Sequence, residues 1–117
     1  MEEVVFLERD ALEADVRRPS FPHAWREHTG IPDAREAARL LEQATIAIVN
    51  KTPLGAATLA LLPRLRMISV AATGTDNIDI AAARARSIVV SNVRGYAEHT
   101  VPEHTFCLIL ALRRSLL

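Results

Sequence analysis

The chain has 117 residues, a length that suits one domain with its own hydrophobic core. Its 14 Lys and Arg residues balance its 14 Asp and Glu residues, so no basic surface for nucleic acid is predicted. The single Cys107 excludes an internal disulfide, and the acidic start MEEVVFLERD is unlike a secretory signal. The longest apolar run, 106–112, is far shorter than the roughly 20 residues that span a bilayer. We therefore expect a cytoplasmic protein with no membrane segment.

Short β-branched runs alternate along the chain with alanine-rich segments. In chain order, the pattern predicts a strand at 4–7, a helix at 33–44, a strand at 46–49, a helix at 56–62, a strand at 67–71, a helix at 80–86 and a strand at 88–91. The segment 17–32 holds three prolines and a glycine, and is predicted to be a loop around a short strand at 24–26. Such alternation is typical of an α/β protein in which helices cover a parallel sheet.

Local chemistry marks several helix starts. Asp33 and Glu36 have the spacing of a capping box, and Thr100 and Glu103 repeat it before a last helix that begins near residue 101. Asp76 and Asp79 precede the helix at 80–86 and are both candidates to cap it.

Polar segments follow three of the predicted strands. They read NKT at 50–52, TGTDN at 73–77 and NVRGY at 92–96. Ligands bind at this edge of open parallel sheets, because the loops diverge there. Gly74 lacks a Cβ, so it can adopt positive φ and let a small anion approach a nest of backbone amides. Lys51 would add a positive charge from the neighbouring loop, so the pattern favours a carboxylate ligand.

Simpler interpretations of the same residues remain open. A glycine between a strand and a helix is often only a turn, and a lysine after a strand is often only solvated. Asn50 and Asn92 are residue types that frequently satisfy loop backbone. The acidic and histidine residues at 98–104 lack the HExxH spacing, so no metal site is predicted.

The stretch VAATGTDNIDIAAARARSIVVSNVRGYAEHTVPEHTFCLILALRR at 70–114 resembles the D-isomer-specific 2-hydroxyacid dehydrogenases, most closely their glycerate dehydrogenase or hydroxypyruvate reductase branch. The resemblance is concentrated from Asn50 onward. It implies that residues 1–99 belong to a flavodoxin-like substrate domain, left incomplete by this chain. It also implies that residues 100–117 form the opening helix of a Rossmann nucleotide-binding domain.

The resemblance also implies roles for individual residues. Main-chain amides at Thr73, Gly74 and Thr75 would bind the carboxylate of a 2-oxo acid, Lys51 would lie beside the substrate, and Thr105 matches a position near the nicotinamide. The helix at 101–117 would pack in a homodimer interface. Two positions depart from the family pattern, because Ser87 stands where glycine is common and Pro102 where alanine is common.

The family's phosphate-binding fingerprint should follow the last helix, but the chain contains no GxGxxG. The family's catalytic arginine, glutamate and histidine also match no position here, so no catalytic residue is assigned. The implied activity is NAD(P)-dependent reduction of a small 2-oxo acid such as hydroxypyruvate or glyoxylate. The chain alone is expected to be inactive and to bind neither NAD nor NADP. The alternative is a freestanding flavodoxin-like module that binds a small carboxylate or a partner chain without catalysis.

Overall fold

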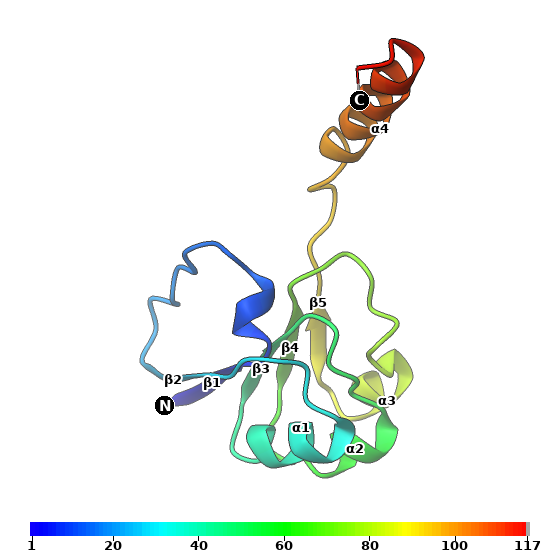
Figure 1. The fold of residues 1–117 in the computed structure, drawn as a ribbon. Coiled ribbons are helices and arrows are strands. Elements are labelled where there is room, and N and C mark those ends of the chain that lie inside the picture. Colours follow the sequence, from blue (N-terminus) through cyan, green and yellow to red (C-terminus); the bar gives the residue numbers. More distant parts are fainter. Residues whose placement is uncertain (117) are drawn as a thin grey trace.

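The computed structural model describes residues 1–116, which form a five-stranded parallel sheet with flanking helices (Figure 1). The strands are β1 (Glu2–Phe6), β2 (His23–Glu27), β3 (Ile46–Val49), β4 (Met67–Val70) and β5 (Val89–Ser91), in the spatial order β2-β1-β3-β4-β5. The helices are the short 3₁₀ helix η1 (Arg9–Ala11), α1 (Ala34–Leu41), α2 (Ala56–Ala60), α3 (Ile80–Ala85) and α4 (Thr100–Arg113). The sheet class and every predicted strand are confirmed.

One face of the sheet carries the hydrophobic core. Alternate residues of β3 and β4 are fully buried, and they pack with the apolar faces of α1, α2 and α3. The intervening residues, such as Ile46 and Met67, are only partly buried and point to the opposite face. On that face the cover is partial, because Val4 and Phe6 of β1 are buried there while Ile46 and Met67 are not.

Two predicted helix caps are confirmed, but the capping box at Asp33 is only half formed, because the Glu36 carboxylate accepts from the Arg39 guanidinium at 2.9 Å instead of reaching back. Asp33 accepts the Glu36 amide at 2.8 Å, and Asp79 accepts the Ala82 amide at 2.9 Å. Asp76 does not cap α3, because Asp79 stands directly before the helix. The predicted capping box at Thr100 is wrong. The chain already turns helically before this residue, with the Val101 amide donating to the Ala97 carbonyl, so Thr100 lies inside α4.

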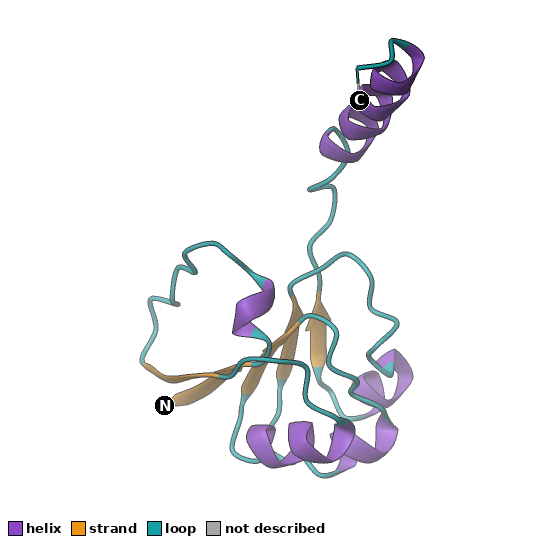
Figure 2. Ribbon diagram, viewed as in Figure 1, coloured by secondary structure: helices purple, strands orange, loops and turns teal. Residues whose placement is uncertain are grey.

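The helix α4 stands apart from the sheet, beyond the carboxyl ends of the strands, at the end of a loop (Figure 2). Its large apolar side chains are exposed, including Phe106 at 65% and Leu112 at 72%. Leu117 lies outside the described residues. Among residues 1–116, no helix combines the length and the apolar character needed to cross a membrane.

Candidate functional site

Three loops meet at the carboxyl edge of the sheet, as the positions of the polar segments predict. The Asn77 side-chain amide donates to the carbonyls of Thr52, at 2.8 Å, and Asn50, at 3.3 Å. It thereby joins the loop after β3 to the loop after β4. The Asn92 side-chain amide donates to the Thr73 carbonyl at 2.7 Å and joins the third loop to the second. The loops therefore form one hydrogen-bonded rim.

The turn at Thr73–Thr75 offers its backbone to solvent. Within the part of the chain that the structure describes, the amides of Thr73, Gly74 and Thr75 find no acceptor. The Thr73 hydroxyl is occupied, because it donates to the Val93 carbonyl at 2.8 Å. These main-chain donors are free to bind an external anion.

Gly74 does not adopt the positive φ that glycine permits, since Gly30 and Gly95 are the only glycines among residues 1–116 with positive φ. Gly74 matters instead for access to the turn. A Cβ at this position would lie 3.2 Å from an Asp76 carboxylate oxygen, on an otherwise exposed surface. An added side chain therefore meets a neighbour and stands beside the free amides.

Lys51 presents its side chain at the same rim. The side chain is exposed, and its ammonium has no hydrogen-bond or ion-pair partner among residues 1–116. The Lys51 amide, by contrast, is bound inside the protein. In the loop after β3, the Lys51 amide is therefore bound inside the protein, while the Lys51 ammonium is exposed to solvent.

The group that binds the Lys51 amide is the carboxylate of Glu8, which the sequence analysis did not single out. Glu8 lies two residues after the end of β1 and is only 1% exposed. Its two oxygens accept the amides of Asn50, Lys51 and Thr52 at 2.8–3.0 Å, and Oε2 also accepts the Thr52 hydroxyl at 2.6 Å. The available sequence signal was an acidic residue placed directly after a buried strand.

The charge of Glu8 is stabilised by these contacts. Burial alone would raise the pKa of the carboxyl group, since it removes water from the charged form. The hydrogen bonds from the Thr52 hydroxyl and from the three loop amides outweigh burial and hold the pKa of Glu8 below its ordinary value of 4.5. Glu8 is therefore an ionised buried carboxylate at neutral pH.

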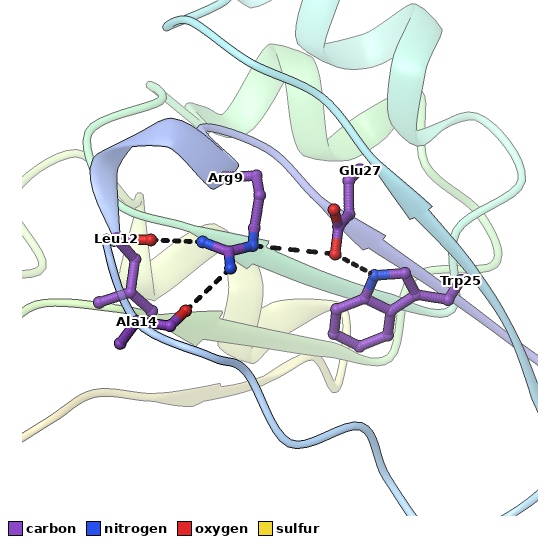
Figure 3. A network of polar contacts seen from close by, with 5 residues as sticks. All are labelled: Arg9, Leu12, Ala14, Trp25 and Glu27. Atoms are coloured by element: carbon purple, nitrogen blue, oxygen red, sulfur yellow. Dashed lines mark hydrogen bonds and ion pairs between the residues drawn. The ribbon is translucent and has the colours of Figure 1, made fainter.

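The chain around Glu8 is fastened to β2 by the network in Figure 3. The Arg9 guanidinium donates to the carbonyls of Leu12 and, at 2.8 Å, Ala14, and lies 3.8 Å from the Glu27 carboxylate. The Trp25 indole donates to the same carboxylate at 2.6 Å. The backbone adds a bond of 2.8 Å from the Arg9 amide to the His28 carbonyl. Glu8 thus projects from an anchored turn.

Comparison with known proteins assigns the chain to a family. A model of the family described as D-isomer specific 2-hydroxyacid dehydrogenase, catalytic domain, matches residues 7–111. The chain belongs to this family. Its resemblance to the family, proposed from the segments at 50–52, 73–77 and 92–96, is confirmed.

Two curated relatives are similar over almost the whole chain. Glycerate dehydrogenase of Methylorubrum extorquens is 50% identical over 113 residues, which cover 97% of this chain and 36% of that protein. A putative 2-hydroxyacid dehydrogenase of Haemophilus influenzae is 41% identical over 117 residues, with the same two coverages. The chain therefore spans about a third of the length of these relatives.

Solved structures share the fold of this dehydrogenase-family chain. The pyruvate reductase of Chlamydomonas reinhardtii superimposes with a TM-score of 0.73 at 20% identity, covering 98% of this chain and 36% of that one. D-lactate dehydrogenase of Aquifex aeolicus, solved with NAD and lactic acid, gives a TM-score of 0.69 at 22% identity and covers 93% and 33%. At these identities the likeness establishes the fold alone.

Thr105, the predicted nicotinamide neighbour, lies on α4, away from the rim. Its hydroxyl donates to the Val101 carbonyl at 2.8 Å. With no GxGxxG in the chain, the described residues do not fit a dinucleotide site of their own. No group of three or more potential metal ligands occurs within residues 1–116.

An apolar groove of about 550 Å³ lies at the opposite edge of the sheet, where β1, β3 and β4 begin. Its lining includes Phe21, Ile46, Arg66 and Met67 and none of the rim residues. The groove shares no residue with the rim and is therefore separate from the candidate site.

Proposed function

We propose that the protein carrying this chain reduces a small 2-oxo acid of the hydroxypyruvate or glyoxylate type to the D-2-hydroxy acid, with NADH or NADPH as reductant. This chain would contribute the substrate-binding part. Family membership and the 50% identity to a glycerate dehydrogenase support the reaction class. Two structural neighbours solved with NAD or NADPH are consistent with a nicotinamide cofactor.

The observation that carries the proposal is the pairing of free donors at the rim. The Lys51 ammonium and the amides of Thr73, Gly74 and Thr75 belong to neighbouring loops, and none of them is satisfied within residues 1–116. A carboxylate accepts hydrogen bonds from backbone amides and gains further from a positive charge. These residues would hold the acid end of the substrate and orient its keto carbon.

The remaining parts of the reaction lie with other residues. The nicotinamide would supply the hydride, while an arginine and a general acid would polarise and protonate the substrate oxygen. No residue of this chain is assigned those roles. We also propose that α4 is covered in the longer protein by a nucleotide-binding domain and a dimer partner, because its apolar side chains are exposed here.

The direct test is a spectrophotometric assay of the full-length protein. Loss of NADH or NADPH absorbance is followed with hydroxypyruvate, glyoxylate and pyruvate, and the configuration of each product is determined. Reduction that yields the D-hydroxy acid is the expected result. Saturable binding of 2-oxo acids without cofactor oxidation would instead favour the freestanding carboxylate-binding module.

A further inference from the structure

Glu8 is held by an unusual concentration of donors. Its carboxylate accepts four different donors from three consecutive residues, 50–52, which lie 42 to 44 positions further along the chain. Successive amides that converge in this way form an anion-binding nest. Here the nest is filled by the protein's own carboxylate. An external acid therefore cannot use these amides, and the loop after β3 can offer a ligand only its Lys51 side chain.

The backbone of Glu8 gives independent evidence of a constrained position. Its φ of 60° and ψ of 39° lie in the left-handed region, which is unfavourable for a residue with a Cβ. Such a conformation persists only where the surroundings determine it. Contacts fix Glu8 from both sides, through the loop at 50–52 and through Arg9, whose guanidinium and amide are bound to neighbouring segments.

We propose that Glu8 is a positioning residue for the substrate site, which fixes the backbone of the 50–52 loop so that Lys51 is held beside the free amides of the 73–75 turn. The inference rests on the proposed function for its readout. Asn77 completes the link, because it bonds to the carbonyls of Asn50 and Thr52 from the loop that contains the turn. Release of the nest would therefore alter the separation between the ammonium and the amides.

A purely structural role for Glu8 makes a different prediction. Substitution of Glu8 would then lower the stability of the protein but leave the Michaelis constant for the acid unchanged in the fraction that remains folded. Positioning of Lys51 instead predicts a selective loss of affinity for the 2-oxo acid, because Lys51 is proposed to contact the carboxylate of that acid. The two roles separate when folded fraction and kinetic constants are measured on the same samples.

The first experiment compares Glu8→Gln and Glu8→Gly with the exposed control Glu42→Gln in the full-length protein. We expect Glu8→Gln to raise KM for hydroxypyruvate by about tenfold with a smaller change in kcat and no change in KM for NADH. Glu8→Gly removes the side chain and suits the left-handed backbone, so it leaves an empty nest. Added acetate or formate should then partly restore KM in Glu8→Gly and should only inhibit the wild type. Folded variants with wild-type KM and no rescue would overturn the proposal.

A second measurement needs no variant and settles the matter if the Glu8 variants do not fold. Backbone amide resonances of the isotopically labelled wild-type protein are followed during a titration with pyruvate. The amides of Thr73–Thr75 should shift, while those of 50–52 should move little and remain protected from hydrogen exchange. Rapid exchange at 50–52, or a direct pyruvate response there, contradicts a nest filled by Glu8. Absence of any 2-oxo acid reduction by the wild type counts against the proposed function instead, and leaves the exchange result to judge Glu8.

Discussion

Two neighbouring loops at the same edge of the sheet deal with negative charge in opposite ways. The loop at 50–52 directs three amides inward, where they bind the buried carboxylate of Glu8. The turn at 73–75 leaves its three amides without an acceptor within residues 1–116. Similar backbone donors thus act as an internal fastening in one loop and as a candidate ligand site in the next. A loop amide therefore marks a candidate binding site only when no group of the protein already accepts its hydrogen bond.

The largest expected effect comes from emptying the filled nest. Glu8→Ala leaves a buried hydroxyl and three amides without their acceptor, and each unsatisfied buried group costs about 1–3 kcal/mol. We expect the free energy of unfolding of the full-length protein to fall by about 3 kcal/mol or more, as measured by denaturant titration. The exposed Glu42→Ala is the control and should change stability by less than about 0.5 kcal/mol. Equal effects of the two substitutions would remove the contrast between the loops.

The sequence predicts the open turn at 73–75 but not the loop filled by Glu8, for a physical reason. Periodicity and β-branched runs report local preferences, so they located all five strands and the loops after them. The role of Glu8 depends on contacts more than 40 residues away, and an acid after an apolar strand is usually read as solvated. Helix ends show the same limit. The predicted helix at 33–44 ends at Leu41, where a tight turn places Ala44 in the core.

The next effect tests the open turn. Lys51→Ala removes one charge-assisted contact to the substrate carboxylate and should lower kcat/KM by about 10- to 150-fold, equivalent to roughly 1.5–3 kcal/mol. Gly74→Val should lower it at least as much, since its side chain meets Asp76 and stands beside the amides. The exposed Arg84→Ala on α3 removes a charge away from the rim and serves as the control. Unchanged steady-state kinetics for both rim variants would dispose of the site.

A smaller effect, the pH dependence of stability, separates the contribution of the Glu8 charge from that of its side-chain packing. The folded-state pKa of Glu8 lies below 4.5, so folding favours the ionised form. The stability that this charge contributes is complete above the pKa of the unfolded chain and is lost as the pH falls through the folded-state pKa. Wild type and Glu8→Gln should therefore differ most near neutral pH and converge under acid conditions. A pH-independent difference would mean that the charge itself contributes nothing.

The smallest expected effect measures the cost of the left-handed backbone conformation, which Ser87 adopts as Glu8 does. Ser87 has a φ of 58° at the end of α3, where its amide donates to the Arg84 carbonyl and the Ile88 amide donates to the Ala83 carbonyl. This is a helix ending that favours glycine, the residue that the resemblance predicts where this chain has serine.

Ser87→Gly should raise the free energy of unfolding by about 0.5–1 kcal/mol, because relief of the left-handed strain exceeds the added flexibility of the unfolded chain. The side chain of Ser87 is exposed and makes no hydrogen bond within residues 1–116, so little is lost with it. Glu8→Gly relieves the same strain yet should destabilise the protein, since it also empties the nest. Thermal or denaturant unfolding of the two variants side by side gives opposite signs if the carboxylate, and not the turn, fastens the 50–52 loop. The same sign in both would show that backbone strain dominates at Glu8.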